Sequence, residues 1–271
     1  MRSLRWRPSA LIRASGVLHV LTLVAVVAAP QLWPWGLGIM CANHGLLTLL
    51  GLWPRSHGLG ANWTQLPAAA AAQRHIAVTI DDGPDPEVTP QVLDILERHA
   101  ARATFFCIGD NAARHPELCR EIVRRGHAVE NHSQRHSHYF AFLGMGGLTR
   151  EIQAAQTTFE TITGRAPVFF RAPAGIRSPL LDPVLAQLGL QLVAWTRRGF
   201  DTRIAQPAVV QRRLLRDIKA GAILLLHDGN CARSASGVPV IVAVLPAVLA
   251  AASAAGLKPV TLAQALLADA P

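Results

Sequence analysis

Two apolar runs occupy most of the first 53 positions of the chain. Residues 15–33 and 35–53 contain 19 residues each and no Asp, Glu, Lys or Arg, and one proline separates them. A helix of that length spans roughly 28 Å at ~1.5 Å per residue, close to the ~30 Å hydrocarbon core of a bilayer. Trp33, Trp35 and Trp53 lie at the ends of the runs, where interfacial aromatic side chains are expected. The pattern predicts a two-helix transmembrane hairpin.

The charges around these runs predict their orientation. Basic residues precede the first run, Arg55 and Arg74 follow the second, and the connection 30–34 has none. By the positive-inside rule both ends of the hairpin face the cytoplasm, which places the rest of the chain on the cytoplasmic side of a bacterial-type inner membrane. The periplasmic side stays open as an alternative. So does a cleaved signal peptide, with basic residues up to Arg13 and small residues near Ala29, although it leaves the second run unexplained.

Asn43 and His44 place polar side chains in the middle of the second run. Polar groups inside a membrane are costly, so they indicate either a functional site or hydrogen bonding between the two helices, which is the favoured interpretation. Residues 54–73 are rich in proline, glycine and alanine, which predicts a linker. The expected domains are therefore 1–53, a basic tail with two membrane helices; 54–73, the linker; and 74–271, the catalytic region.

From residue 75 onward, short β-type runs alternate with helical patterns. Proline or threonine at the starts and glycine at the ends mark the helices. Seven runs are expected as strands: 75–80, 104–108, 127–130, 167–171, 191–196, 222–227 and 258–261. Seven strand–helix units predict a parallel (β/α) barrel, with an open doubly wound sheet as the alternative. The Gly-x-Gly-x-x-Gly pattern does not occur after the first strand, so nothing supports a dinucleotide site.

Composition adds a contrast between the two halves of the chain. Of the 271 residues, 51% are hydrophobic and 16% are charged, and the mean hydropathy is +0.27. The formal net charge is +9, and all 17 acidic residues lie beyond residue 73. Basic residues do not cluster with interleaved aromatic residues, so nucleic acid is not an expected partner. The basicity is attributed to a solvated face and a cluster that flanks the membrane.

Polar residues gather where the expected strands end. In parallel barrels the active site lies at the C-terminal ends of the strands. Each residue there has an ordinary structural explanation when taken alone, but their coincidence predicts an active site. The residues are Asp81, Asp82, His132, His136, Arg171, Asp201 and His227.

His132 and His136 have the spacing of a metal-binding pair. Positions i and i+4 lie one helical turn apart, which aims both imidazoles at one cation. With one carboxylate they form a set that leaves coordination positions open, as a hydrolytic metal needs. A solvent-exposed His-rich loop is the alternative, since His138 follows.

Arg171 and His227 each close an apolar strand. A buried arginine needs a carboxylate partner, and one of Asp81 and Asp82 is the natural candidate. His227 arrives at the barrel mouth from a fully apolar run, which favours a functional histidine over a core one.

These residues form five ordered motifs that resemble those of the polysaccharide deacetylase family, also described as NodB-homology or carbohydrate esterase family four. The family elements TFDDG, HSxxH, RxPxG, Asp/Trp and LxLxH are read here as TIDDG (79–83), HSQRH (132–136), RAPAG (171–175), Trp195 to Asp201, and LLLH (224–227). The resemblance covers roughly residues 75–265. It implies an α/β fold, a distorted (β/α)7-type barrel, here preceded by the N-terminal two-helix transmembrane hairpin.

The resemblance also implies roles. Asp81 is expected to be the general base, and Asp82, His132 and His136 are expected to hold one divalent metal. Zn²⁺ is the expected ion, although two His and one carboxylate also suit other first-row ions.

Further roles follow from the same resemblance. Arg171 is expected to orient Asp81, and Asp201 to pair with His227, the expected general acid. Substrate or oxyanion contacts are expected from Pro173, Ala174, Gly175 and Trp195. Two positions depart from the family pattern: Ile80 replaces an aromatic residue, and Ala174 replaces the common aromatic of the third motif.

The expected function is membrane-anchored, metal-dependent hydrolysis of an N-acetyl or N-formyl group on an amino sugar. The expected partners are an amino-sugar glycan of the cell envelope or a lipid-linked amino sugar, and the membrane. Arg197, Arg198 and Arg203 lie beside Asp201 and suit a phosphate group, with a solvated loop as the alternative.

Two other functions stay open. A metal-dependent phosphoesterase needs ligands for a second ion, and His127 and His138 are the spare candidates. A non-catalytic membrane-anchored glycan-binding protein would not need a base, an acid and metal ligands together.

Overall fold

A computed structural model describes residues 6–268 of the chain. Eight parallel strands form one sheet in the order β5-β4-β3-β2-β1-β7-β6, with β8 pairing beside β1. The strands are β1 (His75–Asp81), β2 (Ala103–Cys107), β3 (Ala128–Asn131), β4 (Phe169–Phe170), β5 (Gln191–Leu192), β6 (Arg197–Arg198), β7 (Ile223–His227) and β8 (Lys258–Pro259). The predicted α/β class and distorted (β/α) barrel are confirmed.

One continuous segment, residues 191–198, joins the two ends of the sheet. Its first part, β5, pairs with β4, and its last part, β6, pairs with β7. The sequence pattern predicted a single strand over 191–196. The chain instead leaves β4 and joins β7, where Thr196 N donates to Ile223 O at 2.8 Å and Thr196 Oγ1 accepts from Ile223 N at 3.0 Å.

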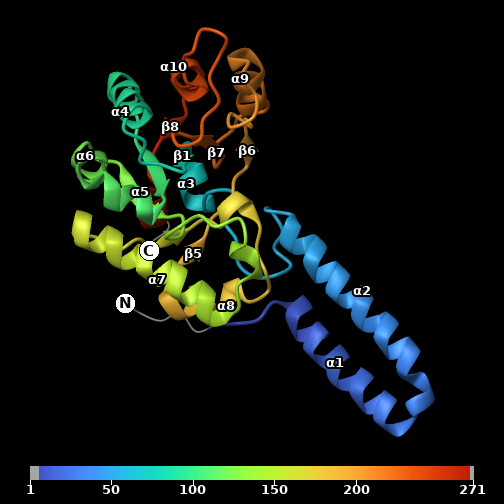
Figure 1. Ribbon diagram of the computed structural model, residues 1–271. Coiled ribbons are helices and arrows are strands. Elements are labelled where there is room, and N and C mark those ends of the chain that lie inside the picture. Colours follow the sequence, from blue (N-terminus) through green and yellow to red (C-terminus); the bar gives the residue numbers. More distant parts are fainter. Residues whose placement is uncertain (1–5, 269–271) are drawn as a thin grey trace.

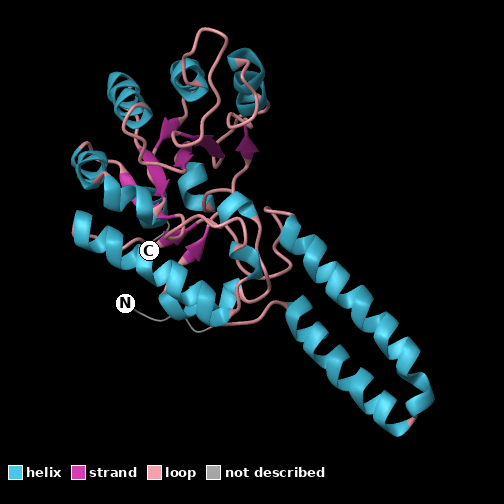
Figure 2. Cartoon of the chain, viewed as in Figure 1, coloured by secondary structure: helices cyan, strands magenta, loops and turns pink. Residues whose placement is uncertain are grey.

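Helices cover the outer face of the sheet (Figure 1, Figure 2). The long helices α4, α7 and α10 pack around the strands, and Gly164 and Gly189 end α7 and α8 in the left-handed conformation expected of terminal glycines. The helices of this region are α3 (Ala68–Ala72), α4 (Val88–Arg98), α5 (Gly109–Arg114), α6 (Pro116–Arg124), α7 (Met145–Thr163), α8 (Leu181–Leu188), α9 (Pro207–Leu215), α10 (Val240–Ala254) and α11 (Leu262–Leu267), with 3-10 turns at η2 (Phe140–Phe142) and η3 (Pro173–Gly175).

Strand alternation decides which side chains point into the barrel. Ile80 on β1 belongs to the hydrophobic cluster shared with the outer helices, whereas Ala77 and Leu225 belong to a second cluster with Phe106 and Phe169. Side chains two positions apart share a face of a strand. The inner face of β1 therefore ends at Asp81, and the inner face of β7 ends at His227.

The two apolar runs form a helical hairpin, α1 (Ala10–Ala28) and α2 (Trp33–Leu52), joined by the 3-10 turn η1 (Pro30–Leu32). The proline that separates the two apolar runs in the sequence, Pro34, does not separate the two helices. Pro34 lies in the first turn of α2, where a missing N–H costs nothing, and Pro30 begins the turn between the helices. Asn43 Nδ2 donates to Ser15 Oγ at 2.9 Å, so this polar side chain joins the two helices.

Both helices are long and apolar enough to cross a membrane, and their apolar side chains are mostly exposed. Figure 1 shows the hairpin projecting away from the barrel. Exposed apolar surface of this extent indicates a hydrophobic partner. The hairpin therefore suggests a membrane anchor or a signal sequence.

The hairpin is attached to the barrel at its base. Trp6 Nε1 donates to Asp182 at 2.8 Å, and Arg177 N donates to Gly51 O at 3.1 Å. Residues 54–73 also lie against the barrel, where Trp63 pairs with Val193 beside β5. The end of α2 thus lies close to the loop that follows β4.

Candidate active site

Asp81 and Arg171 form a buried ion pair inside the barrel mouth. Arg171 Nη1 lies 2.6 Å from Asp81 Oδ1, and Arg171 and Asp81 are only 1% and 3% exposed. Asp81 also faces His227 across the sheet, because the two residues are register partners at the ends of β1 and β7. The structure thus brings together three of the predicted site residues at the C-terminal ends of their strands.

Each nitrogen of the Arg171 guanidinium donates at least one hydrogen bond. Nη1 also donates to Thr79 Oγ1 at 2.8 Å, Nη2 donates to Ala194 O at 2.8 Å, and Nε donates to Val193 O at 3.2 Å. The ring of Phe106 lies 4.1 Å from its central carbon. Four hydrogen bonds from all three nitrogens fix the position of this buried cation, so the Asp81 carboxylate has a fixed partner.

Asp82, His132 and His136 converge on one point. One ligand atom from each lies within 4.8 Å of the others, and Asp82 Oδ1 is 3.3 Å from His132 Nε2 and 3.4 Å from His136 Nε2. Asp82 and His132 are buried, and His136 is partly exposed. This is an Asp/His/His set of the kind that holds a divalent cation with open coordination positions.

The surroundings of this set keep its ligand atoms available. His132 Nδ1 lies 2.8 Å from Arg171 O, and because a carbonyl only accepts, Nδ1 carries the proton and Nε2 keeps its lone pair. Burial by itself raises the pKa of Asp82, but the hydrogen bond with His132 and the neighbouring imidazoles lower it overall. Burial and then the charge of His132 lower the pKa of His136 to about 4. At neutral pH Asp82 is therefore a carboxylate and His136 a neutral imidazole.

The histidine pair does not lie on a helix, contrary to the one-turn interpretation of its spacing. Residues 132–136 form a loop in which Ser133 and His136 have φ of 67° and 50°. Asn131 Oδ1 accepts from Ser133 N at 2.8 Å, and Ser133 Oγ accepts from His136 N at 3.0 Å. These local bonds replace the helical ones and turn both imidazoles toward Asp82.

Asp201 holds His227 through two hydrogen bonds. Its Oδ1 lies 2.9 Å from His227 Nδ1, and its Oδ2 accepts from His227 N at 2.7 Å. Burial lowers the pKa of His227, but the Asp201 hydrogen bond and the charges of Asp201, Asp81 and Asp82 raise it overall. The second ring nitrogen, Nε2, remains for a proton, so the structure joins Asp201 to His227 as the sequence predicted.

The turn after β4 contains the third motif. Ala174 has φ of 54° and Gly175 has φ of 76°, so two consecutive residues adopt the left-handed region. A Cβ on Gly175 would lie 2.6 Å from Trp195 Cη2 and 2.8 Å from Pro54. Only glycine fits there, and the indole of Trp195 therefore packs directly against this turn.

Sequence reasoning missed several residues that complete the site. Thr79 was detectable, because it lies two positions before Asp81 on the same strand face. Asn111 Nδ2 donates to Asp82 O at 2.8 Å, and Asn230 Nδ2 donates to Asp82 Oδ2 at 3.3 Å. Neither asparagine belongs to a motif, so only the fold reveals them.

Asp228 is a further buried carboxyl beside this site. Thr89 Oγ1 donates to it at 2.5 Å, and Gly229 N donates to it at 3.0 Å. Burial raises its pKa to about 7. It connects the loop after β7 to Thr89 of α4 and is not part of the Asp/His/His set.

Neither spare histidine joins the Asp/His/His set. His127 lies before β3, at the end opposite His132, and its Nδ1 accepts from Ala103 N at 3.2 Å. His138 is exposed. Among residues 6–268 one cluster of three potential metal ligands is found, which does not support a second ion.

Comparisons with known proteins agree with this geometry. The family model described as Polysaccharide deacetylase matches residues 68–193. A peptidoglycan-N-acetylglucosamine deacetylase of Bacillus cereus is 35% identical over 164 residues, which cover 60% of this chain and 76% of that relative. The chain belongs to the polysaccharide deacetylase family. A chitooligosaccharide deacetylase of Azorhizobium caulinodans is 38% identical over 158 residues, covering 58% of this chain and 75% of the relative.

A solved structure of the same family shares the fold. The family 4 carbohydrate esterase from Streptomyces lividans, in complex with acetate, superposes with a TM-score of 0.62 at 30% identity, over 68% of this chain and 91% of that one. As a polysaccharide deacetylase, this chain is a hydrolase of non-peptide carbon–nitrogen bonds. The resemblance drawn from the five motifs is confirmed.

Proposed function

We propose that this polysaccharide deacetylase removes an N-acetyl or N-formyl group from an amino sugar of a glycan. The observation that carries the proposal is the meeting of three units at one barrel mouth: the Asp/His/His set, the Asp81–Arg171 pair and the Asp201–His227 pair. Relatives named for peptidoglycan and chitooligosaccharides support an N-acetylglucosamine glycan as the substrate class.

We assign one divalent cation, Zn²⁺, to Asp82, His132 and His136. The donor set fits the ion: it offers an ionised carboxylate and two imidazoles, and Arg171 O holds the His132 ring through Nδ1 so that its Nε2 is available. When bound, such a cation supplies Lewis-acid activation of water and of the acyl oxygen.

Asp81 is the proposed general base, and His227 is the proposed general acid. Asp81 receives the proton of the attacking water, and the Arg171 guanidinium keeps the carboxylate in position for it. An amine leaves poorly unless it is protonated, and His227, whose raised pKa favours the protonated form, supplies that proton. Each such proton transfer contributes typically 10²–10⁴-fold to the rate.

The turn after β4 is the proposed substrate and oxyanion site. Pro173 has no backbone N–H, so only Ala174 and Gly175 can donate from this turn. Gly175 N already donates to Ala172 O. Ala174 N is thus the group we assign to the developing oxyanion. Trp195, packed against Gly175, forms the apolar wall of the substrate site.

We also propose that α1 and α2 anchor the enzyme in a bacterial-type inner membrane, with residues 74–271 as the catalytic domain on the cytoplasmic side. The charge bias around the hairpin supports this orientation. A lipid-linked amino sugar would then be the accessible substrate. C-terminal fusions to a reporter active only in the cytoplasm, and to one active only outside it, test the orientation.

The activity is tested with the full chain purified in detergent and loaded with zinc. We expect acetate release from an N-acetylated chitooligosaccharide, with one zinc bound per chain. A zinc-loaded protein that binds the oligosaccharide but releases no acetate or formate from any N-acyl amino sugar would instead support the glycan-binding alternative.

A further inference from the structure

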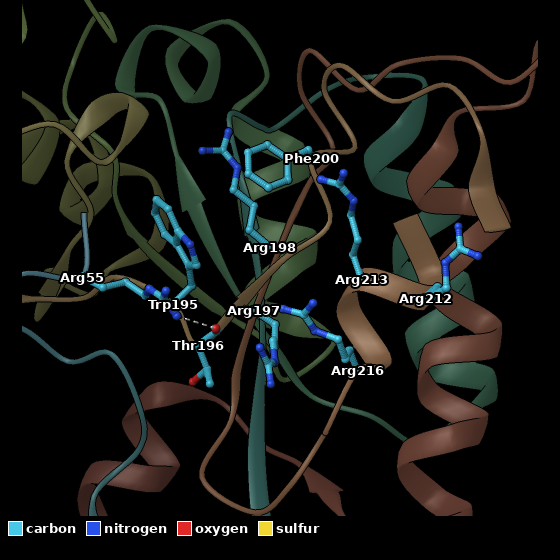
Figure 3. A pocket seen from close by; sticks show the side chains of 9 residues that line it. All are labelled: Arg55, Trp195, Thr196, Arg197, Arg198, Phe200, Arg212, Arg213 and Arg216. Atoms are coloured by element: carbon cyan, nitrogen blue, oxygen red, sulfur yellow. Dashed lines mark hydrogen bonds between the residues drawn. The ribbon is translucent and has the colours of Figure 1, made fainter. Parts of the chain in front are cut away.

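An arginine pocket lies next to Trp195, and its arginines have no role in the reaction described above. It has a volume of about 510 Å³, and two aromatic rings, Trp195 and Phe200, line it together with Thr196. Six arginines line it: Arg55, Arg197, Arg198, Arg212, Arg213 and Arg216. Figure 3 shows that they come from three parts of the chain, the segment after α2, strand β6 and the C-terminal end of helix α9, and that Arg212 points away from the others.

This positive charge is poorly balanced by the protein. Among residues 6–268, the one carboxylate that forms an ion pair with the six arginines is Asp217, which lies 3.4 Å from Arg197 and is 81% exposed. The Nε atoms of Arg197 and Arg198 are buried without a hydrogen-bond partner. Like charges at close range repel, so their convergence from three separate segments points to an anionic ligand.

A solvated face is the ordinary explanation for exposed arginines. Basic residues at the C-terminal end of α9 also stabilise that helix through their interaction with its dipole. Neither explanation accounts for the arginines of β6 and the α2 end, which meet those of α9 across one pocket. In Figure 3, Arg216 points toward Arg197 and Arg213 points toward Phe200, whose ring centre is 5.2 Å from the guanidinium carbon. The two aromatic rings contact the guanidinium groups of Arg198 and Arg213.

The pocket is connected to the active site through two residues. Trp195 packs against Gly175 of the β4 turn on one side, and the Arg198 guanidinium lies 5.3 Å from its ring centre on the other. Phe200 directly precedes Asp201, which holds His227. An anion in the pocket therefore lies one indole ring from the proposed substrate site.

The pocket is also next to the apolar hairpin. Arg55 lies three residues beyond the end of α2 and donates to Thr196 O at 3.3 Å. A group bound here lies close to the expected membrane interface. One guanidinium group can donate two parallel hydrogen bonds to two oxygens of a phosphate. Six arginines carry more positive charge than a single carboxylate ligand would balance.

We propose that the arginine pocket is a binding site for phosphate or diphosphate esters. This inference deepens the proposed function and rests on it, because it assigns the pocket to the phosphate of a lipid-linked amino-sugar substrate. An anionic phospholipid head group carries the same chemistry.

The test uses the full chain in detergent, loaded with zinc, and inorganic diphosphate as the probe in isothermal titration calorimetry. The variant Arg213→Gln/Arg216→Gln removes two pocket charges. Its matched control, Arg98→Gln/Arg120→Gln, removes two exposed charges from α4 and α6, which helix α10 separates from α9 (Figure 1). Equal thermal unfolding midpoints show that the variants are folded.

We expect the pocket variant to weaken diphosphate binding at least tenfold and the control to leave it within twofold. Asp82→Ala, which lacks one proposed metal ligand, is expected to bind like the wild type. Equal binding by the pocket variant and the wild type would overturn the proposal, and so would binding lost in Asp82→Ala alone, which would place the anion at the metal. None of these readings requires turnover, so they stand apart from a failure of the deacetylase proposal.

Two further arms identify the source of the phosphate. If it belongs to the substrate, the pocket variant lowers kcat/KM for a lipid-phosphate ester of N-acetylglucosamine at least tenfold more than for a neutral chitooligosaccharide. If it belongs to the membrane, diphosphate binds at least tenfold more weakly in phosphatidylglycerol nanodiscs than in phosphatidylcholine nanodiscs, and the kcat/KM ratio is unchanged. Both results support a phosphate site, and the absence of diphosphate binding in phosphatidylcholine nanodiscs would contradict it.

Discussion

Arg171 Nη1 lies 2.6 Å from Asp81 Oδ1 at the base of the barrel mouth, with both side chains buried. This pair connects the fold to the chemistry, because the backbone carbonyl of the same arginine also accepts from His132 Nδ1. One residue therefore orients the proposed base through its side chain and a proposed metal ligand through its main chain.

The pair predicts an unequal response to single and double substitution. Arg171→Met leaves the Asp81 carboxylate buried without its partner, which costs about 3–5 kcal/mol of unfolding free energy. Asp81→Asn/Arg171→Met removes both charges and should recover part of that loss. Denaturant unfolding of the three proteins measures the difference, and equal losses in the single and double variants would show that the pair is not coupled.

Asp81 and His132 are predicted to fail in different ways. Asp81→Asn keeps a side chain of the same shape but cannot take a proton, so turnover should fall by at least about 10²-fold while metal is retained. His132→Ala should lose both metal and turnover. Metal content and acetate release of each purified variant check this, and substantial turnover in either one would contradict the assigned roles.

The Asp201–His227 pair predicts the alkaline side of the pH profile. His227 acts as an acid only while protonated, and Asp201 raises its pKa, so activity falls as the pH rises through that raised value. Asp201→Asn removes the charge that raises the pKa and should move the alkaline limb of kcat/KM to lower pH, with a reduced maximum. An alkaline limb at the same pH in both proteins would exclude His227 as the group that titrates.

Glu130 predicts how stability depends on pH. Its Oε2 accepts from Val168 N and Phe169 N at 2.8 Å each, and burial raises its pKa to about 8, from 4.5. The folded state then holds a proton that the unfolded state has released, so this residue lowers stability as the pH rises from about 4.5 to about 8.

Glu130→Gln removes this titration. The variant should lose less stability than the wild type between pH 5 and pH 8, measured as the thermal unfolding midpoint. Some slope should remain, because burial of Asp228 raises its pKa to about 7 in the same direction. The exposed substitution Glu160→Gln is the control, and an identical slope in Glu130→Gln and wild type would show that Glu130 is ionised in the folded protein.

The sequence was most informative for residues whose position along a strand or helix decides where they lie in the fold. Asp81 and His227 could be placed at one barrel mouth, because parallel strands end together and alternate residues share a face. Trp33 and Trp35 marked the hairpin turn to within a few residues. These features depend on the succession of residues within one segment, which the sequence pattern contains directly.

The remaining features depend on contacts between distant segments. The loop of His132 was taken for a helical turn, because spacing alone does not distinguish the two. Arg197 and Arg198 were noted, but Arg203, their expected companion, does not line the pocket, whereas Arg213 does. Only the packing of α9 against β6 decides which arginines meet.

Zinc titration of the full chain, stripped by a chelator and followed by calorimetry, tests the central claim most directly. The account predicts one ion per chain in the wild type, loss of that binding in Asp82→Ala, and acetate release from an N-acetylated chitooligosaccharide that returns only as the ion is restored. Equal binding of zinc by Asp82→Ala and wild type, or full activity in the stripped protein, would contradict the assignment of Asp82, His132 and His136 as the metal site.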